Sequence, residues 1–97
     1  MIQSFANQGT ADLFNSKNTK AARKLIPPAL RKTAHRRLFA LDYVESLQEL
    51  RNVPTYGLHR LHRDRKGQWA IRIDDQYRVC FKWTPAGPAE VEVTDYH

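Results

Sequence analysis

The chain has 97 residues, a formal net charge of +6 at pH 7 and a single cysteine. This length fits one domain with a small core over residues 1–97, and a lone thiol excludes an internal disulfide and a zinc site built from thiolates. We find no signal-peptide pattern and no apolar run of about eighteen residues, so we expect a soluble, cytoplasmic protein that does not enter a membrane.

The N-terminal quarter is predicted to hold one short strand, one helix and one loop. Residues 2–5 have the pattern of an opening strand. Thr10 is the expected N-cap of a helix that ends near Lys17, because a threonine oxygen can accept a hydrogen bond from a free backbone N–H of the first turn. The polar and basic stretch 16–24 is predicted to be a loop.

The longest predicted helix follows the proline pair at 27–28, which suits a first helical turn because proline lacks the N–H that is unpaired there. Its apolar residues recur at helical spacing: Leu30, Ala34, Leu38 and Leu41. The opposite face carries Arg31, Lys32, His35 and Arg36, of which His35 is expected to be solvated. A further turn or two is predicted over 45–50.

From residue 58 onward, apolar and polar residues alternate in three runs, 69–74, 77–83 and 90–94. Period two with one apolar face is typical of an antiparallel sheet that is covered on one side. Turn-forming residues separate the runs, and Cys80 is predicted to be a packed thiol. Helices followed by a sheet meander predict an α+β fold in which the helices cover one face and leave the other open.

Basic side chains are predicted to gather on that open face. The alternation places Arg72, Arg78 and Lys82 there, and Tyr96 has the same outward parity. A basic segment leads into the first strand of the meander, and its side chains could hold phosphates through charge-assisted hydrogen bonds: His59, Arg60, His62, Arg63, Arg65 and Lys66. A solvated cationic face is the open alternative.

The histidines suit acid–base chemistry, because imidazole titrates near neutral pH. No cysteine or carboxylate stands at a familiar ligand spacing from His59 or His62, so we expect no metal site and no cofactor. RNA can be cut without a metal when one group removes the 2′-hydroxyl proton, another protonates the leaving 5′-oxygen, and cations offset the growing phosphate charge. Two histidines, a tyrosine and an arginine on one surface would meet these needs.

Five short motifs occur in a fixed order along nearly the whole chain. They are Met-Ile-Gln-Ser-Phe at 1–5, Tyr-Gly-Leu-His-Arg-Leu at 56–61, Gly-Gln-Trp-Ala-Ile-Arg-Ile at 67–73, Gln-Tyr-Arg-Val-Cys-Phe at 76–81 and Val-Thr-Asp-Tyr-His at 93–97. As an ordered set, they resemble the HigB-type toxins, or plasmid maintenance killer proteins, of the RelE superfamily of type II toxin–antitoxin systems.

This resemblance implies a RelE-like fold, with N-terminal helices on one face of a curved, mainly antiparallel sheet. It implies an endoribonuclease (an mRNA interferase) that cuts mRNA on translating ribosomes and so inhibits translation and growth. The matching positions imply a catalytic set in which Arg78 braces the scissile phosphate: His59, Arg78, Asp95, Tyr96 and His97. The implied partners are a HigA-like helix-turn-helix antitoxin and, only through the complex of the two, operator DNA.

The chain departs from the family pattern in two places. His62 and Arg63 stand where a family lysine is expected, and the stretch 17–29 is more basic and richer in proline. The second hypothesis is therefore a catalytically weak RNA- or partner-binding module on the same fold, acting on translation or ribosomes without mRNA cleavage. The two hypotheses differ in whether the catalytic set matters to toxicity. No helix-turn-helix pattern supports a stand-alone DNA-binding protein.

Overall fold

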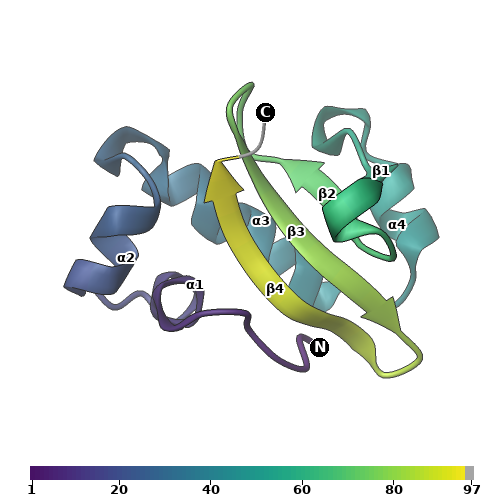
Figure 1. Cartoon of the computed structure of the whole chain (residues 1–97), viewed down its shortest axis with the longest axis horizontal. Helices are drawn as coiled ribbons and strands as arrows, with labels where there is room; N and C mark the ends of the chain where they lie inside the picture. Colours follow the sequence, from purple (N-terminus) through teal and green to yellow (C-terminus); the bar gives the residue numbers. More distant parts are fainter. Residues whose placement is uncertain (96–97) are drawn as a thin grey trace.

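The computed structural model describes residues 1–95, which form a helical layer packed against a four-stranded antiparallel sheet (Figure 1). The helices are α1 (Gln8–Phe14), α2 (Lys20–Leu25), α3 (Arg31–Tyr43) and α4 (Leu47–Arg51), with 3₁₀ turns η1 (Pro28–Leu30), η2 (Pro54–Tyr56) and η3 (Arg63–Arg65). The strands are β1 (His59–Arg60), β2 (Trp69–Arg72), β3 (Tyr77–Thr84) and β4 (Gly87–Asp95), and they lie side by side in chain order. The predicted α+β arrangement, with helices first and a meander afterward, is confirmed.

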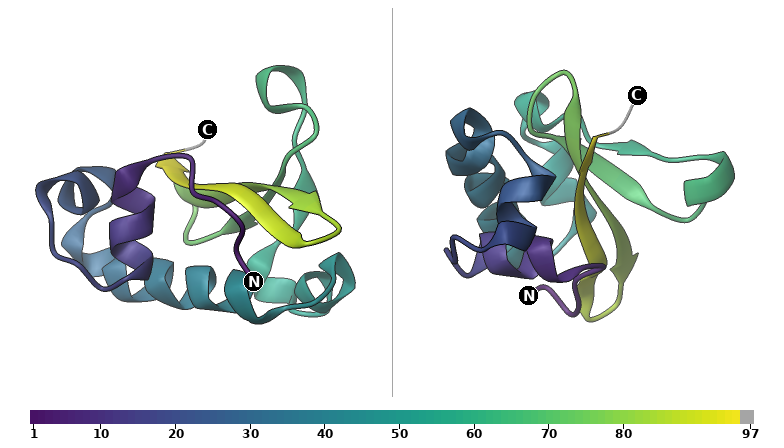
Figure 2. Two further views of the ribbon diagram at one scale, coloured as in Figure 1. Left: turned by 90° about the horizontal axis from the view of Figure 1, so that it is seen from below. Right: turned by 60° about the vertical axis from the view of Figure 1, so that its left-hand side comes forward.

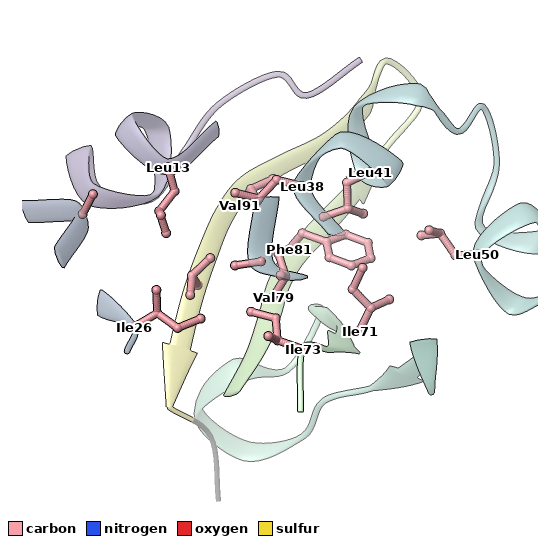
Figure 3. Packing of buried hydrophobic residues seen from close by; sticks show 13 residues of the cluster. Leu13, Ile26, Leu38, Leu41, Leu50, Ile71, Ile73, Val79, Phe81 and Val91 are labelled. Carbon is pink, nitrogen blue, oxygen red and sulfur yellow. The ribbon is translucent and has the colours of Figure 1, made fainter. Parts of the chain in front are cut away.

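The core lies between α3 and the sheet (Figure 3). The inner face of α3 contributes Leu38 and Leu41, which are fully buried against Ile71 of β2 and Phe81 of β3. The helical spacing of α3 and the period of two in the strands therefore give the apolar faces that the sequence predicts. No helix within residues 1–95 is long and apolar enough to cross a membrane.

The first helix begins earlier than predicted. Asn7 is its N-cap, and the Asn7 Oδ1 accepts hydrogen bonds from the backbone N–H of Thr10 at 2.8 Å and from the Thr10 hydroxyl at 2.7 Å. The expectation that Thr10 caps the helix is wrong, since Thr10 lies inside the first turn and is fully buried. Its hydroxyl oxygen accepts a hydrogen bond from the backbone N–H of Val93 in β4 at 3.1 Å.

The predicted loop over 16–24 is also partly wrong, because α2 begins at Lys20. Thr19 caps this helix by accepting a hydrogen bond from the Ala22 N–H at 3.2 Å. The Thr19 hydroxyl also donates to the buried Asp12 carboxylate at 2.6 Å, and Gln8 donates to the same carboxylate at 2.8 Å. These two hydrogen bonds, helped by a nearby lysine and opposed by burial, lower the pKa of Asp12.

The predicted opening strand is an extended segment that runs beside β4. It forms a single parallel bridge, between Phe5 and Val91. The Gln3 N–H donates to the Pro88 carbonyl at 2.7 Å, and the Val91 N–H donates to the Ser4 carbonyl at 3.0 Å. The beginning of the chain thus pairs with the outer edge of the last strand, which would otherwise present unpaired backbone groups.

Residues 58–68, called the arm here, project from the sheet on the side opposite α3 (Figure 2). The base of the arm places Leu61 over Ala70 and Cys80, and all three side chains are buried. The face predicted to be open is therefore partly covered. The prediction that Cys80 is a packed thiol is confirmed, and desolvation raises the pKa of this thiol to about 11.

Candidate active site

The strand register places His59 on the sheet face that lies opposite the helices. His59 pairs with Ala70, Ala70 pairs with Cys80, and Cys80 pairs with Glu92. Directly paired residues of antiparallel strands project to the same face, so these four residues form one row across the sheet. His59 stands at the end of this row, on the edge strand, and its side chain is exposed.

A second row brings Arg78 to the same face. Arg72 pairs with Arg78, and Arg78 pairs with Thr94. This row lies two residues along β2, β3 and β4 from the row of His59, and residues two apart in a strand share a face. The predicted placement of Arg72 and Arg78 away from the helices is thus confirmed, and both lie in the row next to His59.

A backbone carbonyl fixes the proton of the His59 ring. The His59 Nδ1 lies 2.9 Å from the carbonyl oxygen of Gly57. A carbonyl only accepts hydrogen bonds, so Nδ1 carries the hydrogen, and in the neutral ring Nε2 keeps its lone pair. Gly57 has φ +56°, a left-handed conformation that favours glycine. The contact with Gly57 therefore sets the tautomer of the neutral His59 ring and leaves the Nε2 lone pair free of it.

Arg78 is held in place by the turn between β2 and β3. Its Nη1 donates to the carbonyl of Asp74 and, at 3.1 Å, to the carbonyl of Tyr77. The Asp74 carboxylate shapes this turn by accepting hydrogen bonds from the N–H groups of Gln76 at 2.9 Å and Tyr77 at 2.7 Å. A guanidinium has five N–H donors, so two carbonyls bound at one nitrogen orient Arg78 while its other nitrogens can still bind phosphate oxygens.

Arg37 is a contributor that the sequence reasoning missed. It projects from α3, its Nε donates to the carbonyl of Arg72 at 2.9 Å, and its guanidinium lies 4.8 Å from the centre of the Tyr56 ring. Tyr56 directly precedes Gly57, which holds His59. Arg37 thus ties both rows of the site to α3. No signal in the sequence separates it from the solvated cations of the same helix.

The remaining predicted RNA-binding residues fall into three groups. His62, Arg63 and Lys66 are exposed on the arm, and none has an ion pair within residues 1–95. Arg72 and Lys82 pair with exposed carboxylates at 2.5 and 2.9 Å, contacts that contribute little and that a phosphate could replace.

The third group consists of two arginines with structural contacts. Arg65 binds Glu92 at 3.0 Å and ties the arm to β4 above Cys80. Arg60 pairs with Trp69 and therefore faces away from His59, with its guanidinium 5.3 Å from the centre of the Trp69 ring. The structure thus separates Arg60 from the face that carries His59 and Arg78.

Three members of the predicted catalytic set belong to the end of the chain. Asp95 pairs with Tyr77, so it has the opposite parity to Arg78 and Thr94, and it accepts a hydrogen bond from the Gln76 Nε2 at 2.8 Å. Tyr96 and His97 lie outside the described residues. Among residues 1–95, no three His, Cys, Asp or Glu side chains are grouped so that they could hold a metal ion.

The sequence also matches known proteins. The family model described as the RelE-like toxin of the type II toxin–antitoxin system HigB matches residues 3–97. The chain is 31% identical to the Endoribonuclease HigB of Proteus vulgaris over 97 residues, which is 100% of both chains. It is 33% identical to Toxin HigB-1 of Vibrio cholerae serotype O1 (strain ATCC 39315 / El Tor Inaba N16961) over 60 residues, 62% of this chain and 63% of that protein. The resemblance inferred from the five motifs is therefore confirmed, and the chain belongs to the RelE-like HigB toxins of type II toxin–antitoxin systems.

Proposed function

We propose that this chain is a ribosome-dependent mRNA endonuclease that inhibits translation and growth, and that it cuts RNA without a metal. The observation that carries the proposal is the position of His59 and Arg78 in neighbouring rows of one sheet face, His59 with an available Nε2 and Arg78 with an oriented guanidinium. The similarity to a protein named Endoribonuclease HigB supports the same activity.

In the proposed reaction, His59 Nε2 takes the proton of an RNA 2′-hydroxyl, and the 2′-oxygen attacks the adjacent phosphorus. Arg78 binds the phosphate oxygens and offsets the charge that grows on them. The bond from phosphorus to the 5′-oxygen then breaks, and a protonated group supplies the hydrogen of the leaving 5′-hydroxyl, which leaves a 2′,3′-cyclic phosphate.

The end of the chain completes the proposed site. We assign the second proton transfer to His97, although the two histidines could exchange roles. Tyr96 is proposed to stack on a base or to orient the phosphate, and Asp95 belongs to the same set. These assignments rest on the terminal motif of the family, because Tyr96 and His97 lie outside the described residues.

The arm and the neighbouring cations would guide the RNA. His62, Arg63 and Lys66 extend the basic surface beyond His59, and phosphate contacts of this kind position nucleic acid without reading its sequence. The substrate is mRNA on the ribosome, in the cytoplasm, with further contacts to ribosomal RNA. A HigA-like helix-turn-helix antitoxin would neutralise the toxin, and operator DNA would be bound only through the complex of the two.

The alternative is a catalytically weak RNA- or partner-binding module on this fold. The observation that favours it is that Arg65, Arg72 and Lys82 each form an ion pair with a carboxylate of the chain. These ion pairs compete with a phosphate for the same cations. Such a module would arrest growth through binding, and removal of His59 would not relieve the arrest.

The test is induced expression of the wild type, His59→Ala and His97→Ala, with growth curves and mapping of mRNA 5′ ends. His35→Gln is the matched control, because His35 lies in the helical layer, in contact with Ser16 and Phe14, and belongs neither to the proposed catalytic set nor to the arm. We expect new in-frame cuts and growth arrest for the wild type and the control, and neither for the other two variants. Arrest by all four proteins without new cuts would overturn the proposal.

A further inference from the structure

The positive charge of the chain is concentrated in residues 13–41, from the end of α1 to the last turn of α3, rather than at the candidate active site. Residues 13–41 contain eight lysines and arginines and no acidic residue, whereas the other 68 residues contain eight basic and ten acidic ones. None of these eight cations has an ion pair within the described part of the chain: Lys17, Lys20, Arg23, Lys24, Arg31, Lys32, Arg36 and Arg37. Apart from Arg37, which supports the candidate site, these cations are not used by the proposed chemistry.

One exposed stripe of α3 combines this charge with aromatic rings. Lys32, Arg36, Phe39 and Tyr43 follow one another at intervals of four, three and four residues, which places them on one side of the helix. Phe39 is 53% exposed and Tyr43 is 86% exposed. At 1.5 Å per residue the stripe is about 16 Å long, or three helical turns. It is cationic at one end and apolar at the other.

The ring at the middle of this stripe is held rigidly. The ring centre of Phe39 lies 5.3 Å from that of Phe14 and 4.4 Å from that of His35. The His35 Nε2 in turn lies 3.1 Å from the Ser16 hydroxyl and 3.2 Å from the Phe14 carbonyl, so the expectation that His35 is simply solvated is wrong. An exposed ring with fixed packing loses little conformational freedom when a partner binds.

A hollow of about 230 Å³ adjoins the cationic end of the stripe. It is lined by Leu13, Ser16, Arg31, Lys32 and His35. Its lining combines an apolar side chain, a hydroxyl, two cationic groups and an imidazole. Such a hollow fits one apolar side chain flanked by carboxylates.

We propose that the stripe Lys32–Arg36–Phe39–Tyr43 and this hollow dock an acidic, amphipathic helix of the antitoxin. Its carboxylates bind Lys32 and Arg36, and its apolar residues pack on Phe39 and Tyr43 over about three turns. The proposal rests on the proposed function, since the partner is the antitoxin of the toxin–antitoxin pair. An RNA backbone would use the cations but would leave the exposed apolar surface of Phe39 and Tyr43 uncovered.

The experiment measures binding of the cognate HigA-like antitoxin to this chain by calorimetry. The toxin carries His59→Ala throughout, so that binding does not depend on cleavage. We expect Lys32→Glu combined with Arg36→Glu to weaken binding about 30-fold or more, with an effect that shrinks as salt rises. The matched control combines Arg63→Glu with Lys66→Glu on the arm, which makes the same charge change at exposed positions, and should stay within about threefold of the parent.

A second pair of substitutions tests the apolar end of the stripe. Phe39→Ser with Tyr43→Ser should weaken antitoxin binding about tenfold or more without changing its salt dependence. Thermal unfolding of every variant verifies the fold, and Lys32→Ala with Arg36→Ala provides a milder change at the cationic end.

Two results would overturn the docking proposal. Antitoxin binding that is equal for the stripe variants and the arm control would show that the helix docks elsewhere. Loss of co-sedimentation with ribosomes, but not of antitoxin binding, would assign the stripe to RNA. Failure of the proposed function would be seen separately, as a wild-type chain that makes no new mRNA ends.

Discussion

Replacement of Arg78 by alanine should separate cleavage from folding. The guanidinium donates to two carbonyls of the β2–β3 turn and is only partly buried, so its loss should lower the free energy of unfolding by about 1 kcal/mol. For a domain of this size, that change corresponds to a fall of roughly 4–8 °C in Tm. Loss of an oriented donor to the transition-state phosphate should slow cleavage by about 10²-fold.

The assay for this prediction uses a reconstituted translation system with one defined mRNA, and it follows new 5′ ends under single-turnover conditions. Circular dichroism gives the Tm of the same preparations. Arg78→Lys keeps the charge but not the planar set of donors, so it should recover only part of the rate. A rate within twofold of the wild type for Arg78→Ala would remove Arg78 from the mechanism. A fall in Tm of more than about 20 °C would show that its placement on the exposed face is wrong.

Three further predictions concern groups outside the phosphate site. Arg37→Ala should lower kcat more than it raises KM when cleavage is measured under multiple-turnover conditions, because it loosens the segment that orients His59 without removing a substrate contact. A change in KM alone would contradict this. The pKa of Cys80 is raised to about 11 and the thiol is buried under Leu61, so iodoacetamide at pH 8 should label Cys80 only as fast as the folded protein opens locally. Labelling at the rate of a free thiol would show that Leu61 does not cover Cys80. The pKa of Asp12 is lower in the folded chain than its ordinary value of 3.8, so the Asp12 carboxylate stabilises the fold at neutral pH, and this stabilisation is lost as the pH falls below about 4. Urea unfolding at pH 7 and at pH 3 should therefore show a smaller loss of stability for Asp12→Asn than for the wild type.

Periodicity predicted the parts of the fold whose residues face one large core. Leu38 and Leu41 recur at helical spacing, and Val79 and Phe81 recur at every second position between Arg78 and Lys82, so their buried faces are visible in the sequence. The α2 helix was missed because it buries only Ala22 fully and is otherwise mostly basic and exposed. Its existence depends on the Thr19 cap and on contact with α1, which no periodic pattern reports.

The candidate site was predictable to the extent that it depends on strand parity. Alternation alone places Arg72 and Arg78 on one face, and the register adds His59. The carbonyl that holds His59, the turn that holds Arg78 and the long-range contact from Arg37 all depend on where the backbone passes. Local sequence patterns do not contain that information, and for the same reason the coverage of Cys80 by the arm was not anticipated.

The pairing of residues 3–6 with β4 has a consequence for the order of folding. Ser4 and Glu90 are joined by a hydrogen bond across 86 residues of sequence, and the bridge between Phe5 and Val91 lies beside it. Closing so long a loop is entropically costly, so we expect this contact to form after the helices and the β2–β3–β4 meander have docked. β4 also supplies Thr94 to the row that contains Arg78. The contact that forms last therefore anchors the strand next to Arg78.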